Sequence, residues 1–437
     1  MLVDDLHKHL YNQIVQHDVG LCKEDFMITI LCSGSRGDFQ PYIALAQELK
    51  KLDKNVRIAG GTSFEAYIKA YGIEFYPLSF DYLSIKIDPK LLQDAQSSDN
   101  PLKMLFTFNK MKNYVFGLTE EMFDACKGSE LIIYHPGCTI GYFAGIELGI
   151  PSILAAPFPM HKTKEIASLI SYGKTKMPIA MSYTLIQGML WMASKTGIKK
   201  FYREKYGKLP INFGSPFEKI DVYHQAIISC SNYVFNRPKD WNKYIHQKGY
   251  WFVKENEEYT PSNELNDFLQ KGDKPIYIGF GSVFDLKHKE ETIKIIIDAL
   301  YISKKRGIIS GMGGIENLPE NIITVDNVPH SWLFNQVSLV CHHGGAGTTA
   351  AGFKAGIPSI IIPFSNDQFA WAHRAHDLRV GSEPIYRKKL TTEKLVSAIH
   401  SALKDEVIES AKVLGNNIAL ENGARDCAKI ILERLNG

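Results

Sequence analysis

Short apolar runs alternate with amphipathic stretches along the chain. Residues 26–32 (FMITILC) are almost continuously apolar, which is typical of a strand buried on both faces, and residues 55–60 (NVRIAG) predict a second strand. Between them, residues 41–52 (PYIALAQELKKL) repeat apolar positions with the spacing of an amphipathic helix. Pro41 would then occupy the first helical position, where its missing N–H leaves no hydrogen bond unmade. The pattern predicts a strand–helix–strand unit.

The same alternation continues through both halves of the chain. Residues 130–135 and 151–158 predict further strands, and in the second half residues 275–282 predict a strand followed by a helix over 290–305. Repeated strand–helix–strand units imply parallel sheets covered by helices on both faces. Two such series predict an α/β protein with two Rossmann-like domains.

The polar, proline-bearing residues 235–264 have weak periodicity and mark the join between the domains. We therefore expect an N-terminal domain over 1–237 and a C-terminal domain over 238–437. The predicted last helix, residues 423–435, is followed by no strand, so it can pack on either domain, and a return to the N-terminal domain is one of the two possibilities.

Composition limits the class of protein. A chain of 437 residues favours two domains of about 200 residues each, and 45% hydrophobic with 22% charged residues is ordinary for a soluble protein. A net charge of only +3 gives no strong field for nucleic acid. The seven cysteines form no Cys-x-x-Cys pair, so we expect neither a disulfide framework nor a zinc site, and a reducing, cytoplasmic location.

Two segments bear on targeting. The first residues, MLVDDLHKHL, are charged and lack an apolar core, so we expect no signal peptide. The apolar stretch 131–158 is interrupted by His135, Pro136, Glu147 and Pro151, which favours strand, helix and strand over a membrane span. The sequence gives no indication of the oligomeric state.

A glycine-rich stretch, HHGGAGTTAAG (342–352), lies between the predicted strand 337–341 and a predicted helix over 348–355 that Gly356 would end. Bare backbone at a helix N-terminus lets N–H groups approach an anion, which the helix dipole also attracts. Thr348 and Thr349 could cap this helix, and a histidine at the strand end adds another donor. The pattern predicts a diphosphate site; the alternative is a plain tight turn.

The following strand ends in PFSNDQ (363–368). Side chains at the carboxyl edge of a parallel sheet face the ligand crevice. Asp367 and Gln368 can together accept from and donate to neighbouring hydroxyls, as a sugar requires. Asp367 could also cap the next helix, and the two roles are compatible.

Four motifs together resemble the GT-B glycosyltransferases. They are GSRGDFQPYIALAQELKK (34–51), GFGS (279–282), VPHSWLF (328–334) and the glycine stretch continued to the NDQ motif (342–368). They are most similar to the branch of sterol glucosyltransferases and glycopeptide-antibiotic glucosyltransferases. The resemblance covers residues 26 to 400, although Asn366 stands where the sterol branch has glycine.

The resemblance implies that the C-terminal domain binds a UDP-sugar, with UDP-glucose as the donor and no other cofactor. The main chain of Val328 and the ring of Trp332 would contact the uracil, and His330 would either join them or be structural. Diphosphate contacts would come from the ring of His343 and the N–H groups of Gly345, Gly347, Thr348 and Thr349. Ser282 would bind the diphosphate from the opposite loop, whereas His342 would be structural.

The N-terminal domain would complete the site. The resemblance implies that the loop containing Ser35, Arg36 and Gly37 reaches the diphosphate across the cleft, and that Asp367 and Gln368 hold the sugar hydroxyls. The chain contains no Asp-x-Asp, so we expect no metal to hold the diphosphate. A metal-free displacement needs a base for the acceptor hydroxyl and donors for the leaving UDP.

Asp38 is the candidate base, because it lies in the loop after the first strand and faces the predicted cleft. Its alternative role is a helix cap, in which case His135 and His161 become the next candidates. A single displacement on an α-linked donor inverts the anomeric centre and gives a β-glycoside.

The acceptor pocket would be built by the insertions 78–125 and 160–225, which are rich in aromatic residues and methionine. They predict a lipophilic alcohol such as a sterol; ordinary helix core is the alternative for any single residue. The basic, aromatic run 194–208 is either a peripheral contact with an anionic membrane or a solvated helix end. Competing functions are transfer to another hydroxylated lipid, polyphenol or natural-product aglycone, a UDP-sugar epimerase, and a non-catalytic nucleotide-sugar or lipid-binding protein.

Overall fold

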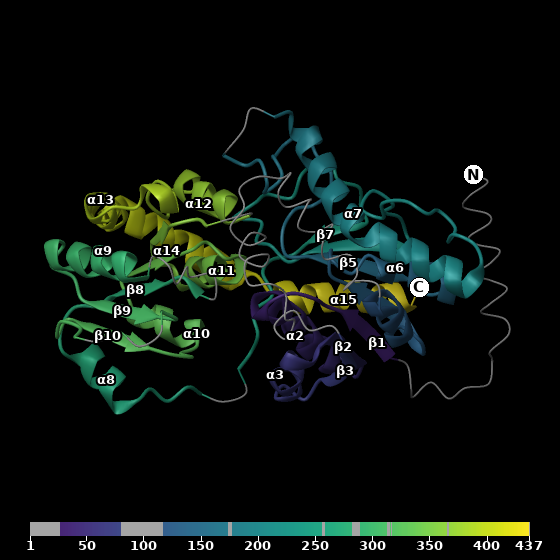
Figure 1. Ribbon diagram of the computed structural model, residues 1–437, viewed down its shortest axis with the longest axis horizontal. Helices are drawn as coiled ribbons and strands as arrows, with labels where there is room; N and C mark the ends of the chain where they lie inside the picture. Colours follow the sequence, from purple (N-terminus) through teal and green to yellow (C-terminus); the bar gives the residue numbers. More distant parts are fainter. Residues whose placement is uncertain are drawn as a thin grey trace.

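The computed structural model consists of two α/β bodies that lie side by side (Figure 1). The structure describes residues 27–79, 117–173, 177–255, 258–281, 289–312, 315, 317–364 and 367–436. Each body contains one parallel sheet with helices on its faces, which confirms the predicted α/β class with two Rossmann-like domains.

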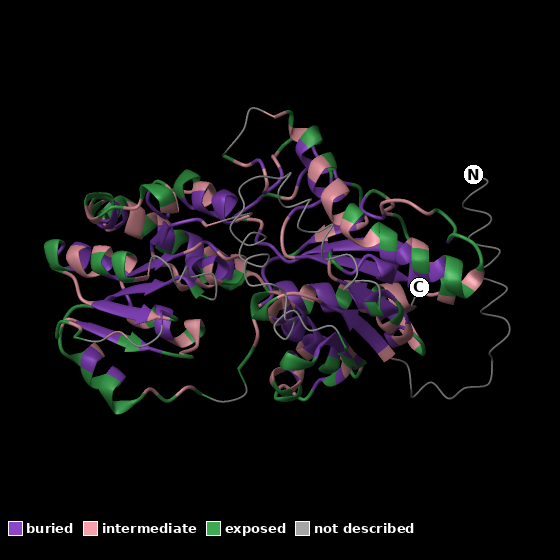
Figure 2. Ribbon diagram, in the orientation of Figure 1, coloured by how far each residue is buried: buried purple, intermediate pink, exposed green. Residues whose placement is uncertain are grey.

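The N-terminal sheet has the strand order β3-β2-β1-β4-β5-β6-β7, and all of its pairs are parallel. Its strands are β1 (Met27–Leu31), β2 (Asn55–Gly61), β3 (Glu74–Leu78), β4 (Ser129–Tyr134), β5 (Ser152–Ala156), β6 (His224–Ile228) and β7 (Ile245–Gln247). Its helices include α2 (Arg36–Lys50), α3 (Glu65–Lys69), α6 (Ile140–Leu148) and α7 (Ile179–Tyr206). Every residue of β5 and β6 is buried, as expected for strands covered on both faces (Figure 2).

The C-terminal sheet has the order β10-β9-β8-β11-β12 and is also parallel. Its strands are β8 (Ile276–Gly279), β9 (Gly307–Ser310), β10 (Ile322–Val325), β11 (Leu339–His342) and β12 (Ser359–Ile361). The associated helices are α8 (Asn263–Gln270), α9 (Lys289–Ile302), α10 (His330–Leu333), α11 (Ala346–Ala355), α12 (Gln368–Asp377), α13 (Thr392–Ala402) and α14 (Asp405–Leu420).

The last helix, α15 (Gly423–Asn436), leaves the C-terminal body and packs along α2 of the N-terminal one (Figure 1). Ala424, Cys427, Ala428 and Ile431 are buried in the same core as the strands of the first sheet. Their spacing of three, four and seven residues places all four on one helix face. Of the two possibilities open in the sequence, the structure shows the return to the N-terminal domain.

The domain boundary lies later than the sequence predicted. β7 pairs with β6, so the first sheet continues to Gln247, beyond the expected boundary at 237/238. The three-residue strand Ile-His-Gln is too short and too polar to show a strand pattern. The crossover to the second domain therefore runs between β7 and α8.

Helix α2 begins at Arg36, so the prediction that it starts at Pro41 is wrong. Ser35 is its N-cap residue, and the Asp38 carboxylate accepts the Ser35 N–H in a capping box. Pro41 consequently lies inside the helix, where it removes the hydrogen bond that this position would donate to the Gly37 carbonyl. The extra turn carries the Ser35–Asp38 segment to the carboxyl edge of the sheet.

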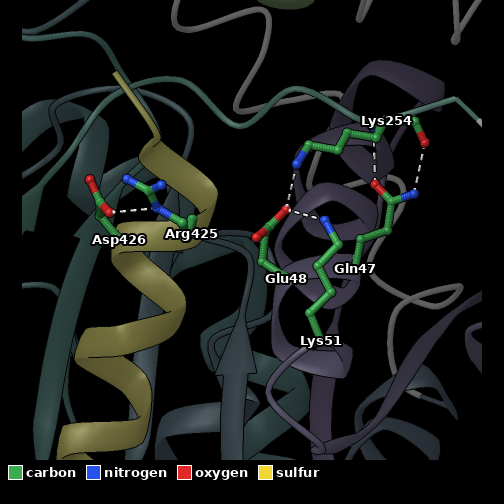
Figure 3. A network of polar contacts seen from close by, with 6 residues as sticks. All are labelled: Gln47, Glu48, Lys51, Lys254, Arg425 and Asp426. Atoms are coloured by element: carbon green, nitrogen blue, oxygen red, sulfur yellow. Dashed lines mark hydrogen bonds and ion pairs between the residues drawn. The ribbon is translucent and has the colours of Figure 1, made fainter. Parts of the chain in front are cut away.

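The crossover is fastened to α2 by polar contacts (Figure 3). The Gln47 amide donates to the Lys254 carbonyl at 2.8 Å and accepts the Lys254 N–H at 3.0 Å. The Glu48 carboxylate lies 3.2 Å from the Lys254 ammonium and 2.7 Å from that of Lys51. Burial opposes ionisation of Glu48, but the two ammonium groups outweigh it and lower the pKa of this carboxyl. The helix that presents Asp38 is thereby tied to the segment that joins the domains.

Candidate functional site

Residues of the loops after β1, β10 and β11 come within electrostatic range of one another between the two domains. The pKa of His330 is lowered to about 4, mainly by burial and in addition by the electrostatic effects of Arg36 and His343. Arg36 belongs to the first domain, whereas His330 and His343 belong to the second. The Arg36 guanidinium also lies over the ring of Tyr67, 4.6 Å from its centroid. Arg36, the predicted cross-cleft residue, therefore acts on the same histidine of the second domain as His343 of the predicted diphosphate loop.

Asp38 both caps α2 and faces a histidine. Its Oδ2 accepts from the Ser35 N–H at 2.6 Å and from the Ser35 hydroxyl at 2.9 Å. Its Oδ1 lies 3.9 Å from Nε2 of His135, and about a third of the side chain is exposed. A Cβ at Gly34, which has φ +135°, would collide with the carboxylate, so this position requires glycine. Oδ2 therefore caps the helix, whereas Oδ1 faces His135.

His135 follows β4, which is the neighbour of β1 in the sheet. Its Nδ1 accepts the Gly137 N–H at 3.1 Å, so the proton of the neutral ring lies on Nε2, toward Asp38. Burial lowers the pKa of His135, although the negative charge of Asp38 opposes this. Asp38 and His135 line a small cavity at the carboxyl edge of the sheet, together with Pro41, Tyr42, Ala156, Pro157, Ser229 and Trp251.

His161, the other alternative base, is packed inside the N-terminal domain. Its Nδ1 donates to the Phe217 carbonyl at 2.8 Å, and its ring meets the ring of Trp241 edge-on. The side chain is buried, and burial lowers its pKa to about 4. Of the two alternative histidines, the structure places His135 beside Asp38.

The glycine loop ends in a helix N-terminus, as the sequence predicted, but the cap is different. α11 begins at Ala346 with Gly345 as its N-cap residue. Thr349 uses both its N–H and its hydroxyl on the Gly345 carbonyl, each at 2.9 Å, so the prediction that Thr348 and Thr349 cap the helix is wrong. The first-turn N–H groups without a helical acceptor are those of Gly345, Ala346, Gly347 and Thr348. Ala346 was missed because the sequence placed the helix start two residues later.

His343 sits between the loops that follow β8 and β11. A Cβ at Gly281 would come 3.3 Å from its Cε1, and a Cβ at Gly345 would come 2.7 Å from its Nε2. Its Nδ1 is buried and has no hydrogen-bond partner among the described residues. Burial lowers the pKa of His343 to about 4, and the backbone of Gly279 partly offsets this. His343 is therefore a neutral imidazole at the glycine loop, and its Nδ1 is free to bind a ligand. Ser282, the other predicted diphosphate contact, lies outside the described residues.

His342 has no exposed surface, and its Nδ1 accepts the Gly344 N–H at 3.1 Å. Burial lowers its pKa well below the usual value. The ring therefore stays neutral and holds the backbone of the glycine loop, which agrees with the structural role expected for His342.

Asp367 and Gln368 are held in fixed orientations at the start of α12. The Asp367 carboxylate accepts from the buried Trp371 indole N–H at 2.9 Å and makes no cap hydrogen bond to α12, so its predicted capping role is wrong. The Gln368 carbonyl oxygen accepts the Phe364 N–H at 2.8 Å. A Cβ on Gly344 would lie 3.1 Å from the main-chain carbonyl oxygen of Gln368, so the glycine loop packs directly on this segment. Asn366 lies outside the described residues.

The VPHSWLF segment forms an aromatic cluster. The Trp332 ring lies 5.1 Å from the ring of Tyr259, and the His330 ring stacks on Phe334 at 4.5 Å with an interplanar angle of 14°. His330 Nε2 is 3.3 Å from the Tyr277 hydroxyl, while Val328 packs against the adjoining core. Tyr259 was missed because it stands in the polar crossover, where no periodicity marks it.

The described ranges contain no group of three or more His, Cys, Asp or Glu side chains arranged to hold a metal ion. They also contain no helix with the length and apolar content needed to cross a membrane.

Two protein families match the chain. The glycosyltransferase family 28 N-terminal domain matches residues 28–158, and the C-terminal domain of the erythromycin biosynthesis protein CIII-like family matches residues 309–435. Together these matches fall on both sheets.

Sterol 3-beta-glucosyltransferases are similar over most of the chain. UGT80B1 of Arabidopsis thaliana is 33% identical over 410 residues, covering 89% of this chain and 65% of that protein. UGT80A2 of the same plant is 32% identical over 430 residues, covering 93% of this chain and 65% of that protein. The sterol 3-beta-glucosyltransferase of Cryptococcus neoformans is 31% identical over 436 residues, covering 92% of this chain but 26% of that protein. The chain thus spans less than two thirds of the length of these relatives.

Crystal structures of glycosyltransferases share the fold. The kitacinnamycin glycosyltransferase superposes with a TM-score of 0.68 at 16% identity, over 93% of this chain and 98% of that chain. CalG4, the calicheamicin glycosyltransferase, superposes with a TM-score of 0.67 at 15% identity, over 95% of this chain and 99% of that chain. The matched families, the similar sequences and the shared fold together show that this chain belongs to the GT-B glycosyltransferases.

Proposed function

We propose that the protein transfers glucose from UDP-glucose to the hydroxyl of a lipophilic acceptor, with sterols as the acceptor class, by an inverting, metal-independent displacement. The acceptor class rests on the similarity to sterol 3-beta-glucosyltransferases of Arabidopsis and Cryptococcus. The observation that carries the reaction is that Arg36, in the Asp38 loop of the first domain, and His343, in the glycine loop of the second, both act electrostatically on His330.

The C-terminal domain would bind the donor. The N–H groups of Gly345, Ala346, Gly347 and Thr348, with the positive end of α11, suit the diphosphate. The ring of His343 would add a hydrogen bond from the opposite side, and Arg36 would supply a positive charge across the cleft. Trp332 suits the uracil ring, while Asp367 and Gln368 suit the sugar hydroxyls.

The N-terminal domain would activate the acceptor. As the acceptor oxygen attacks the anomeric carbon, its proton passes to Oδ1 of Asp38, and the bond from that carbon to the diphosphate oxygen breaks. UDP leaves with the bonding electrons, and its charge is stabilised by the N–H groups of the α11 N-terminus. Attack opposite to the leaving group converts an α-linked donor into a β-glucoside. His135, with its N–H toward Asp38, would orient the carboxylate.

Incubating the purified protein with UDP-glucose and separate sterols, hydroxylated fatty acids and polyphenols tests this proposal by mass spectrometry. We expect a mass increase of one hexose on a sterol, and an axial–axial proton coupling at the anomeric carbon of the product by NMR. Transfer only to a polyphenol would replace the acceptor class. Interconversion of UDP-sugars without an acceptor would favour an epimerase, and binding without turnover would favour a non-catalytic protein.

A further inference from the structure

Helix α7 has a long outer face that no other described element packs against to form a core. Met181 and Met192 are 59% and 48% exposed, and they stand eleven residues apart. Lys199 follows seven residues later and Arg203 four residues after that. At 3.6 residues per turn these spacings are close to whole turns, so the four side chains lie on one face of the helix. The opposite face is buried and includes Tyr183, Ile186, Ile198 and Phe201.

The loop that follows α7 also turns apolar side chains outward. Gly207 ends the helix in the left-handed conformation. Leu209 and Ile211 are then 36% and 54% exposed, whereas Pro210 between them is buried. Because Pro210 anchors the loop, its two neighbours project from a fixed support rather than from a loose end.

The same region concentrates positive charge. Residues 194–211 contain six Lys or Arg and one acidic residue, Glu204, a balance of +5, whereas the whole chain carries only +3. Lys205 lies 3.6 Å from Asp124, and Lys200 lies 3.9 Å from Glu204. Within the described ranges the other four basic side chains have no ion-pair partner: Lys195, Lys199, Arg203 and Lys208.

We propose that the outer face of α7 and the 207–211 loop form a docking surface for an anionic lipid bilayer. Exposed Met, Leu and Ile side chains would enter the interface between headgroups and acyl chains, and the basic side chains would contact lipid phosphates. A solvated helix end would account for the basic side chains, but it would not account for the exposed apolar side chains of Leu209 and Ile211. A nucleic acid would likewise use only the charges. The surface belongs to the domain to which we assign the lipophilic acceptor, but the inference does not depend on the transfer reaction.

Sedimentation of the full chain with unilamellar vesicles tests the proposal. The vesicles contain phosphatidylcholine alone or phosphatidylcholine with phosphatidylserine, and no donor or acceptor is added. We compare the charge variant Lys199→Gln/Arg203→Gln and the apolar variant Ile211→Asp with the unchanged chain. Matched controls come from exposed positions of the second domain, Lys294→Gln/Lys412→Gln for charge and Tyr301→Asp for the apolar change, since Tyr301 is 79% exposed beside Lys304 and Lys305.

We expect the unchanged chain to bind only those vesicles that contain phosphatidylserine. The charge variant should lower this binding about tenfold or more, because it removes two positive charges that face the anionic surface. Ile211→Asp should lower it as clearly, and both controls should bind as the unchanged chain does. Melting curves confirm that each variant is folded. Equal binding to both vesicle types, no effect of Ile211→Asp, or a loss with Tyr301→Asp would each overturn the proposal. Transfer to a water-soluble acceptor is measured separately, so loss of docking and loss of catalysis are distinguished.

Discussion

Replacing Asp38 by Asn separates its two roles. The Asn side-chain oxygen can still accept the Ser35 N–H that Asp38 Oδ2 accepts at 2.6 Å, so α2 keeps its cap. The amide cannot take the acceptor proton. A positioned general base contributes about 10²–10⁴-fold, so we expect kcat to fall by that factor, equivalent to about 3–5 kcal/mol of activation free energy. Affinity for UDP-glucose should change little, because the carboxylate is not assigned to the donor.

The structure also sets the expected stability change. Asp38→Asn should leave the melting temperature nearly unchanged, whereas Asp38→Ala loses both hydrogen bonds to Ser35 and should cost about 1 kcal/mol of folding free energy. Asp53→Asn is the matched control, because Asp53 is exposed beyond the other end of α2 and has φ 56°, which Asn tolerates.

The assay is single-turnover transfer at saturating UDP-glucose and acceptor, so that the chemical step limits the rate, with calorimetry for donor affinity. Retention of more than about a tenth of wild-type kcat by Asp38→Asn would refute the assignment of Asp38 as base. His135→Gln would then decide whether the neighbouring ring takes the proton.

Three other predictions concern sugar binding, metal independence and the effect of pH on stability. Asp367→Asn and Gln368→Ala should lower affinity for UDP-glucose by about 1.5–3 kcal/mol while leaving UDP affinity nearly unchanged, since both are assigned to sugar hydroxyls; equal losses by calorimetry would contradict this. UDP-glucose should raise the melting temperature, and EDTA should not abolish turnover; activity lost with EDTA and restored by magnesium would refute metal independence. The pKa of buried His161 is about 4 in the fold and about 6.5 in the unfolded chain, so the unfolded chain binds more protons between these values. The free energy of unfolding should therefore fall as pH drops from 6.5 toward 4, and His161→Gln should flatten that fall in urea titrations.

Local pattern determined much of the fold and of the donor loop. Apolar runs predicted β1 and β8, because strands covered on both faces are apolar along most of their length. The glycine stretch predicted a loop between β11 and α11 because so much bare backbone suits neither element. The true start of α2 was also encoded locally, in the Ser-x-x-Asp spacing of Ser35 and Asp38, but the proline at position 41 was the stronger visible cue.

Only the tertiary structure decided which of these pieces meet. His135 approaches Asp38 because β4 pairs with β1, with Tyr134 opposite Leu31, and strand order is not written in either segment. Tyr259 reaches Trp332, and α15 returns to α2, through contacts between residues far apart in the chain. Periodicity reports which face of an element is buried, whereas the partner of that face depends on how all the elements pack together. The sequence by itself therefore determined the elements and the chemistry at their ends, and packing determined the pairs that make a site.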